Sequence, residues 1–245
     1  MTWVLDLDGV VWLAGKALPG AADAVERLRA KGERVLFLTN NAGPTLAEHA
    51  AKLRHVGIQA ERDDIISSAQ AGASLLAEGT KTLVIGGEGL YEALGDRKVK
   101  IVTDWQQAEA VVVGRTEKFG YRDLEAATLA IRNGARFIGT NDDSTYPTPQ
   151  GLVPGAGAII AAVSTAAGQE PEIAGKPCQP VADLVRQRVG QVSTCVGDRP
   201  DTDGLMARRL KARFVLVLTG VTTRADLPVD PEPDEIVDDL AAAVQ

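Results

Sequence analysis

Val4-Leu5-Asp6-Leu7-Asp8-Gly9-Val10, near the start of a chain of 245 residues, begins as a buried strand and ends in two carboxylates. Burying two like charges for structure alone is costly, which favours a ligand as the reason for them. Residues two apart in extended chain point to the same side, so Asp6 and Asp8 are predicted to face one ligand beyond the carboxyl end of a sheet. Gly9 lets the backbone leave the strand tightly around a bound ion or phosphate.

Short apolar, β-rich runs alternate with helix-like stretches along the whole chain, which is typical of an α/β protein with mainly parallel sheets. Helices are predicted from Pro19 to Ala30, where apolar residues recur at helical spacing before Gly32, and from Thr45 to His55. The predicted strands are residues 3–7, 34–38, 82–86, 111–114, 136–139, 193–197 and 214–218.

The middle of the chain has the pattern of a second α/β unit, because strand signals resume at Thr82 and continue to Gly139. Polar turns mark its two edges, one at residues 78–80 and the other at residues 168–171. We therefore predict a Rossmann-like parallel-sheet core domain, into which an α/β cap domain is inserted. The core comprises residues 1–80 and 171–245, and the cap comprises residues 81–170.

Composition excludes several classes of partner. The net charge of −7 disfavours nucleic acid and anionic membrane surfaces, and no apolar run approaches the ~20 residues that span a bilayer. The first residues carry carboxylates where a secretory signal carries basic residues, so we expect a cytoplasmic protein. Cys178 and Cys195 are then expected to be reduced thiols. His49 and His55 lie six residues apart, which does not suit a metal pair on one helix, and both are expected to be solvated.

A second acidic group follows the strand predicted at 193–197, in the segment Asp198-Arg199-Pro200-Asp201-Thr202-Asp203. Carboxylates that follow two strands of one sheet make a hard, oxygen-rich site. Such a site favours Mg2+ over zinc, because no histidine or cysteine joins either acidic group. Taken alone, Asp201 is better explained as a turn residue.

Two further segments offer groups that suit a phosphate. Thr39, Asn40 and Asn41 follow the strand predicted at 34–38, and their hydroxyl, amide and backbone N–H groups are suitable donors for phosphate oxygens. Lys176 stands between Gly175 and Pro177 and could neutralise phosphate charge or pair with an acid. Each segment alone would be interpreted as a turn or as surface.

Taken in order, four motifs resemble those of the haloacid dehalogenase superfamily. They are Asp6-Leu7-Asp8-Gly9-Val10, Leu38-Thr39-Asn40-Asn41, Gly175-Lys176-Pro177, and Gly197-Asp198 through Asp203. The chain is most similar to the branch of nitrophenyl, phosphoglycolate and glycerol-phosphate phosphatases, whose large α/β cap is inserted between the second and third motifs. The predicted insert falls there, and the similarity covers nearly the whole chain.

The resemblance implies a phosphoric monoester hydrolase that uses Mg2+ and forms an aspartyl phosphate. Asp6 is implied as nucleophile and metal ligand, and Asp8 as general acid and base whose backbone carbonyl also binds the metal. Asp198 would complete the protein's metal ligands. Asp203 would orient this group of ligands from behind.

The resemblance also implies how a small phosphorylated metabolite binds. Thr39, Asn40 and Asn41 would hold the phosphate, and Lys176 would stabilise the nucleophile and the transferring group. The loop from Asn141 to Gln150 would overhang the core site in such a protein, which makes Tyr146 and Pro147 the expected specificity residues. Phosphoglycolate, glycerol phosphate, nucleotides and pyridoxal phosphate stay open as substrates. In similar proteins the cap can also form a homodimer surface.

Two other functions stay open at this point. The turn Gly86-Gly87-Glu88-Gly89 follows a predicted strand and could belong to a nicotinamide-dependent oxidoreductase. The third glycine position of that fingerprint falls on Glu92, which is too large for close helix packing, so a tight turn is favoured. The other alternative is a catalytically inactive phosphate-binding protein on the same scaffold, although every acid of the motifs is present.

Overall fold

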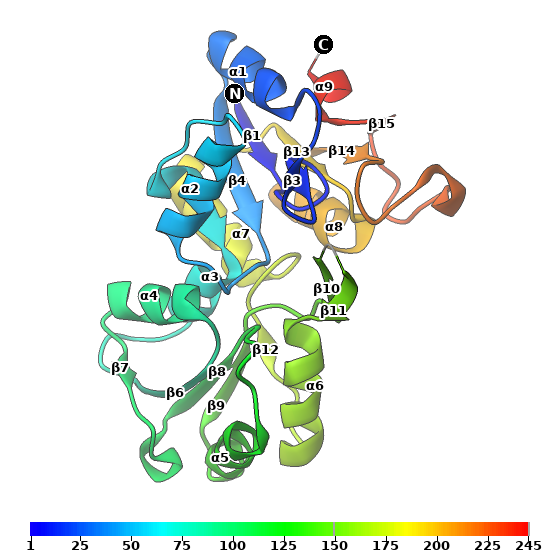
Figure 1. The fold of residues 1–245 in the computed structure, drawn as a ribbon. Helices are drawn as coiled ribbons and strands as arrows, with labels where there is room; N and C mark the ends of the chain where they lie inside the picture. Colours follow the sequence, from blue (N-terminus) through cyan, green and yellow to red (C-terminus); the bar gives the residue numbers. More distant parts are fainter. Residues whose placement is uncertain (149, 245) are drawn as a thin grey trace. The chain divides into compact units, whose positions relative to one another are not determined.

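The computed structural model describes residues 1–148 and 150–244, which form two compact α/β units (Figure 1). The first unit comprises residues 1–39, residues 46–66 and the chain from Lys176 onwards. The second unit comprises residues 40–45 and Ser67–Gly175. The division into core and cap domains at residues 80/81 and 170/171 stays a prediction.

The first unit contains a six-stranded sheet in the order β15-β14-β13-β1-β4-β5. β1 pairs in parallel with both β4 and β13, and β14 pairs in parallel with β13 and β15. Parallel pairing brings the carboxyl ends of these strands to one edge of the sheet. The strands are β1 Thr2–Leu5, β4 Arg34–Thr39, β5 Ile65–Ser67, β13 Thr194–Gly197, β14 Arg213–Val217 and β15 Glu235–Val237.

Helices of the first unit pack on this sheet through apolar faces. Leu28 of α1 and Leu53 of α2 are fully buried in one cluster with Leu5 and Phe37 of the strands. A small hairpin, β2 Trp12–Leu13 and β3 Lys16–Ala17, precedes α1. The helices are α1 Ala21–Ala30, α2 Leu46–His55, α7 Gln179–Val189, α8 Leu205–Leu210 and α9 Leu240–Ala243, with short turns at Arg62–Asp64, Pro200–Gly204 and Arg224–Asp226.

The second unit contains a five-stranded parallel sheet in the order β12-β9-β8-β6-β7, and a separate hairpin, β10–β11. Along β8, Val111 and Val113 join one apolar cluster and Val112 joins another, as expected for side chains that alternate between the two faces. The strands are β6 Lys81–Ile85, β7 Lys100–Ile101, β8 Ala110–Val113, β9 Arg136–Gly139, β10 Thr145–Thr148, β11 Gly151–Pro154 and β12 Glu172–Ile173.

Helices cover both faces of this second sheet. Residues of α5 and α6 pack in the cluster that contains Val111, whereas residues of α3 and α4 pack in the cluster that contains Val112. The helices are α3 Ser68–Ser74, α4 Glu88–Asp96, α5 Tyr121–Arg132 and α6 Ala156–Ala167, with a short turn at Trp105–Gln107. Within residues 1–148 and 150–244, no helix combines the length and apolar character needed to cross a bilayer.

The structure confirms the α/β class and all seven predicted strands, with shifts of one or two residues at their ends. The largest shift is at β1, which ends at Leu5 and leaves Asp6 beyond the strand. The expectation for His49 is wrong. Its side chain is only 3% exposed, because it lies on the buried face of α2 between Leu46 and Leu53. His55 is exposed, as expected.

The glycine-rich turn before α4 has a packing explanation. A Cβ on Gly89 would lie 2.0 Å from the carbonyl oxygen of Pro44, and one on Gly87 would lie 2.7 Å from that of Gly43. Gly89 N also donates to Gly43 O at 2.8 Å. These glycines therefore let the turn approach the backbone of residues 43–44, which accounts for them without a dinucleotide.

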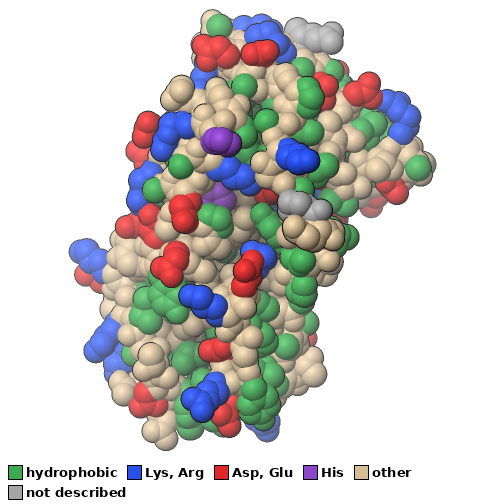
Figure 2. All heavy atoms as spheres, in the orientation of Figure 1, with side chains coloured by type: hydrophobic (Ala, Val, Ile, Leu, Met, Phe, Trp, Pro, Cys, Tyr) green, Lys and Arg blue, Asp and Glu red, His purple; other side chains and the backbone are tan. Residues whose placement is uncertain are grey.

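Acidic and basic side chains are interspersed over the face of the molecule drawn in Figure 2. The two cysteines are both free. Cys195 lies buried in β13, and burial raises the pKa of its thiol to about 12. Cys178 is half-buried just before α7.

Candidate active site

A buried lysine joins two carboxylates in the first unit. Lys176 Nζ lies 2.6 Å from Asp6 Oδ1 and 2.6 Å from Asp203 Oδ1, and the three side chains are between 5% and 10% exposed. Burial by itself would lower the pKa of Lys176, but the charges of Asp203 and Asp6 and their hydrogen bonds raise it above its ordinary value. Lys176 is therefore a fixed positive charge at this site.

Asp6 has a strongly perturbed environment. Burial raises the pKa of its carboxyl group well above the ordinary range; Lys176 opposes this shift, and the negative charges of Asp203 and Asp198 add to it. The backbone holds the residue in place, since Asp6 N donates to Val196 O of β13 at 3.0 Å. A carboxylate so crowded by other acids is stabilised by any further cation that binds beside it.

The acids form a group that suits a divalent cation. Asp6, Asp198 and Asp203 are all buried, and each offers a carboxylate oxygen within 4.8 Å of those of the other two. Burial and then the charge of Asp203 raise the pKa of Asp198 to about 7. Asp198 Oδ1 is buried without a hydrogen-bond partner among the described residues. An unsatisfied carboxylate oxygen in a cluster of acids fits a hard metal ion such as magnesium.

Glycines on two loops make room for Asp198. A Cβ on Gly220 would lie 1.9 Å from Asp198 Oδ2, and one on Gly9 would lie 2.5 Å from the same atom. Gly9 also has a φ of +90°, a conformation that side chains other than glycine rarely adopt. Val221 N donates to Asp198 Oδ2 at 2.5 Å. The loop after β14 and the turn after β1 thus enclose this carboxylate.

The turn Pro200–Gly204 places Asp203 against Lys176. Asp203 N donates to Arg199 O at 2.7 Å, and Asp203 Oδ2 accepts from Arg199 N at 3.2 Å. A Cβ on Gly197 would lie 2.2 Å from Asp203, so the end of β13 must carry a glycine for the carboxylate to fit. With its backbone and one carboxylate oxygen held in this way, Asp203 contacts Lys176 Nζ through its other oxygen, Oδ1, at 2.6 Å. Asp201 is exposed and pairs with Arg199 at 3.8 Å.

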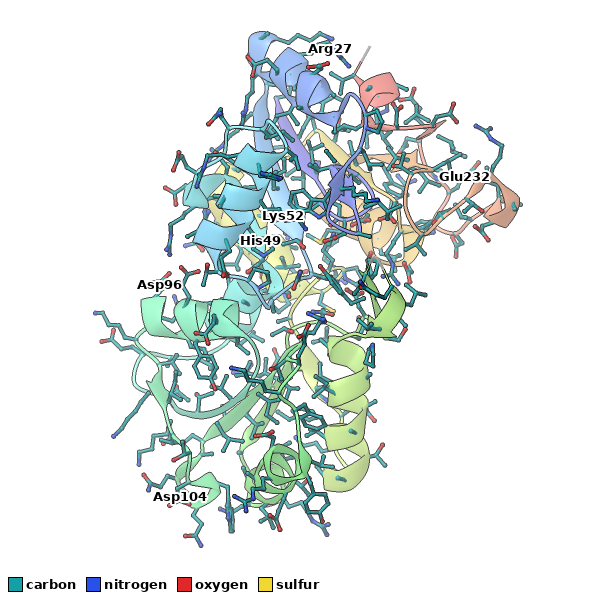
Figure 3. The ribbon with its side chains drawn as sticks, viewed as in Figure 1. Arg27, His49, Lys52, Asp96, Asp104 and Glu232 are labelled. Atoms are coloured by element: carbon teal, nitrogen blue, oxygen red, sulfur yellow. The ribbon has the colours of Figure 1, made fainter. Side chains whose placement is uncertain are left out.

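Asp8 has a different set of partners. Its Oδ1 accepts a hydrogen bond from Trp12 Nε1 at 3.0 Å, and Lys52 Nζ lies 4.0 Å from the centroid of the Trp12 ring. Burial raises the pKa of Asp8, while the charge of Lys52, the Trp12 hydrogen bond and the charge of Lys176 act in the opposite direction. Lys52 projects from α2, where it is labelled in Figure 3. Sequence reasoning identified neither Trp12 nor Lys52.

The predicted phosphate-binding residues lie at the end of β4 and just after it. Thr39 is its last residue and is 2% exposed. The carbonyl oxygen of Asn40, in the second unit, accepts from Ser68 Oγ at 2.5 Å and from Asn141 Nδ2 at 2.7 Å. These two bonds fix the backbone just after Thr39. From the sequence, Asn141 is predicted only as the start of the specificity loop, and Ser68 has no predicted role.

A polar cluster of the second unit contains Tyr146, one of the two predicted specificity positions. Asn41 Nδ2 donates to the Tyr146 hydroxyl at 3.2 Å, and the Arg115 guanidinium lies 4.4 Å from the centroid of the Tyr146 ring. Pro147 is paired with Leu152 across the β10–β11 hairpin. Arg115 was also missed, although its place two residues after the end of β8 matches that of the other strand-end polar groups. Within the predicted loop, residue 149 lies outside the described residues.

Two family descriptions match the chain. Residues 3–100 match the family described as haloacid dehalogenase-like hydrolase, and residues 173–243 match a second description of the same kind of hydrolase. The first match contains Asp6, Asp8 and Thr39, and the second contains Lys176, Asp198 and Asp203. The matched segments therefore include the whole buried acid cluster.

Relatives with curated names are phosphatases. The chain is 38% identical over 231 residues to the D-glycerol 3-phosphate phosphatase of Mycobacterium tuberculosis, spanning 91% of this chain and 64% of that protein. It is 36% identical over 233 residues to the acid sugar phosphatase of Staphylococcus epidermidis, spanning 92% of this chain and 89% of that one.

A solved structure of a glycerol phosphate phosphatase from Mycobacterium tuberculosis, in complex with magnesium, has the same fold. It superposes with a TM-score of 0.93 at 36% identity, over 100% of this chain and 76% of that one. The likeness thus extends through both α/β units and the order of their motifs. The chain belongs to the haloacid dehalogenase-like hydrolase family, within its branch of phosphoric monoester hydrolases.

Proposed function

We propose that this chain removes phosphate from small phosphorylated molecules, using magnesium and an aspartyl phosphate formed on Asp6. The observation that carries the proposal is the buried cluster in which Lys176 Nζ lies 2.6 Å from both Asp6 and Asp203. Phosphoryl transfer needs a positioned nucleophile and positive charge beside the transferring group. The cluster provides a fixed carboxylate, a fixed lysine and a set of oxygen ligands together.

In the first half of the reaction, an oxygen of Asp6 attacks the phosphorus, and the bond between phosphorus and the leaving oxygen breaks. The leaving oxygen keeps the electron pair and takes a proton from the Asp8 carboxyl group. In the second half, the Asp8 carboxylate takes a proton from a water molecule as that water attacks the phosphorus. The bond between phosphorus and the Asp6 oxygen breaks, Asp6 keeps the electron pair and is regenerated as a carboxylate, and inorganic phosphate is released.

Asp6 and Asp198, with the backbone carbonyl of Asp8, are the proposed magnesium ligands. When bound, the ion supplies positive charge that reduces the repulsion between Asp6 and the phosphoryl oxygens. Lys176 adds charge of the same sign, and Asp203 keeps the lysine in place through its 2.6 Å ion pair. Buried charge is effective here because the surroundings do not screen it as water does.

Thr39, Asn40 and Asn41 are proposed to hold the phosphate through hydroxyl, amide and backbone N–H groups. The two hydrogen bonds that the Asn40 carbonyl accepts fix the backbone at this point, which supports a binding role for the neighbouring N–H groups. We further propose that the second unit acts as a cap and that Tyr146 and Pro147 select the leaving group. Glycerol phosphate and sugar phosphates are the first candidates, because the named relatives act on such compounds.

The proposal is tested by steady-state assays of the purified chain with p-nitrophenyl phosphate and a panel of phosphorylated metabolites. We expect turnover with magnesium, none in excess chelator, and recovery when magnesium is restored. The ranking of kcat/KM across the panel then identifies the substrate class. Binding of phosphate without turnover of any ester would instead favour a catalytically inactive phosphate-binding protein.

A further inference from the structure

Asp8, Trp12 and Lys52 form a linked group on one side of the acid cluster. Trp12 Nε1 donates to Asp8 Oδ1 at 3.0 Å, and Lys52 Nζ stands 4.0 Å from the centre of the indole ring. Neither Trp12 nor Lys52 has a part in the proposed reaction as given above. Both are related to it through the Asp8 carboxylate.

The turn after β1 holds the indole rigidly. The carbonyl oxygen of Leu7 accepts from Val11 N at 2.9 Å and from Trp12 N at 3.2 Å, and Gly9 N donates to Trp12 O at 2.7 Å. The chain therefore folds back on itself within five residues. Trp12 is 1% exposed and packs in the main apolar cluster of the first unit, so its ring has little freedom to move.

Lys52 reaches the same place from another element. It lies on α2, whose neighbouring residue Leu53 is fully buried in the same apolar cluster as Trp12. Its ammonium group lies over the face of the indole, where a cation is attracted to the ring. The side chain is half-buried, so its charge is less screened than that of a surface lysine.

We propose that Trp12 and Lys52 are positioning residues for Asp8: the indole N–H fixes the rotation of the carboxylate, and the lysine secures the indole. This inference rests on the proposed function, in which Asp8 moves a proton to the leaving group and from water. A carboxylate held by one directional hydrogen bond presents its other oxygen at a constant place. Proton transfer requires hydrogen-bond geometry between that oxygen and the leaving oxygen.

The test measures the rate of the first chemical step in single turnovers, with an alkyl phosphate and with p-nitrophenyl phosphate. Trp12→Phe retains an aromatic ring beneath Lys52 but removes the N–H donor, and Lys52→Met retains most of the side chain's length but removes the charge. Asp8 becomes charged as it gives up its proton, and losing a hydrogen bond to a charged group typically corresponds to a slowing of roughly 10- to 100-fold. We expect Trp12→Phe to slow the alkyl ester by about that factor and Lys52→Met by less.

The nitrophenyl ester provides the internal comparison, because nitrophenolate leaves readily without a proton. Its first step should change little in either variant, and KM and magnesium affinity should stay near the parent values for both esters. Asp8→Asn should show the same dependence on leaving group, more strongly. Adding Trp12→Phe to Asp8→Asn should then not slow the first step any further, because the effects of residues that act through one group are not additive.

Matched controls separate these effects from a general loss of lysine or tryptophan. Lys16→Met removes the same charge from an exposed position on β3, in the hairpin that carries Trp12. Trp105→Phe makes the same aromatic change in the second unit. Both controls should keep the first-step rates of the parent protein for both esters.

Three results overturn the inference, and they show whether the role of Asp8 stands or falls with it. Equal slowing of the two esters in Trp12→Phe, or full additivity with Asp8→Asn, would show that Trp12 is structural, while the role of Asp8 would stand. Equal slowing of the two esters in Asp8→Asn itself would remove Asp8 as the acid, and the inference would fall with that part of the proposed function.

Discussion

The two units of this chain are built alike but differ in the polar groups that they carry. Both contain a parallel sheet flanked by helices. The first unit buries charged groups, with Lys176, Asp6 and Asp203 each at most 10% exposed on their side chains. The second unit has amides, hydroxyls and a partly exposed arginine, in the cluster formed by Asn41, Tyr146 and Arg115.

This difference indicates how the work of the enzyme is divided. Burying a charge costs several kcal/mol of folding free energy for each ion. A buried cluster of charges therefore indicates that the chemistry of the site requires fixed charge. Neutral and partly exposed groups can change with little effect on the fold. We infer that the buried charges of the first unit perform the chemical step common to all substrates, and that Tyr146 and Pro147 of the second unit contribute the choice among them.

The largest effect should come from Asp6→Asn. Asparagine has nearly the same shape but is neither a nucleophile nor a charged ligand, so turnover should fall by about 10⁴-fold or more. The measurement is kcat with p-nitrophenyl phosphate, accompanied by circular dichroism to verify that the fold is retained. Activity near the parent level in this variant would remove Asp6 as the nucleophile.

The next largest effect should be on stability, in Lys176→Met. Removing one partner of a buried ion pair leaves uncompensated charge and typically lowers the free energy of unfolding by about 3–5 kcal/mol. Lys98→Met is the matched change in the second unit, where the lysine pairs with Glu78 at 3.5 Å and both side chains are more than two-thirds exposed. That change should cost about 0–1 kcal/mol. Urea unfolding in the absence of magnesium measures both, and equal losses would contradict the contrast between the units.

A third prediction concerns the space around Asp198. Gly220→Ala would place a methyl group 1.9 Å from Asp198 Oδ2, so the carboxylate must move. Disturbing the support of a metal ligand typically costs about 10- to 100-fold in metal affinity. Gly95→Ala in α4 is the control, because nothing lies within 4 Å of the added carbon. Calorimetric titration with magnesium should show weaker binding in the first variant only.

The smallest predicted effect is a change of preference in Tyr146→Ala. Loss of the ring removes one contact each of Asn41 and Arg115 in the second unit. We expect kcat/KM ratios between phosphorylated metabolites to change by about tenfold, which corresponds to roughly 1.4 kcal/mol. Hydrolysis of p-nitrophenyl phosphate should be nearly unaffected. An unchanged ranking of metabolites would argue against a selective role for this unit.

The sequence predicts the longer strands well and the short ones poorly. β4 and β14 are continuous apolar runs, which the pattern reveals directly. β7 and β12 are two residues long and mix a charged residue with an isoleucine, so nothing in their sequence marks them. They are defined by their pairing with β6 and β9, which depends on the assembled sheet.

The site is predictable as a set of residues but not as a set of contacts. The position of Asp6 after a strand indicates a ligand, yet its 2.6 Å contact with Lys176 joins residues 170 positions apart. The hydrogen bond between Trp12 and Asp8 depends on the turn geometry of residues 7–12. No spacing in the sequence predicts that Lys52 of α2 lies over the ring of Trp12. His49 shows the same limit, since an apolar helix face buried a residue that its chemistry alone would leave in water.

The most direct measurement of the central claim is to trap the phosphorylated enzyme. Asp8→Asn should slow the release of phosphate from Asp6, so a single turnover with radiolabelled p-nitrophenyl phosphate should leave label on the protein after acid quenching. Proteolysis and mass spectrometry should then locate the phosphate on Asp6, and hydroxylamine should remove it. Release of nitrophenolate with no labelled protein, or label on another residue, would contradict the account.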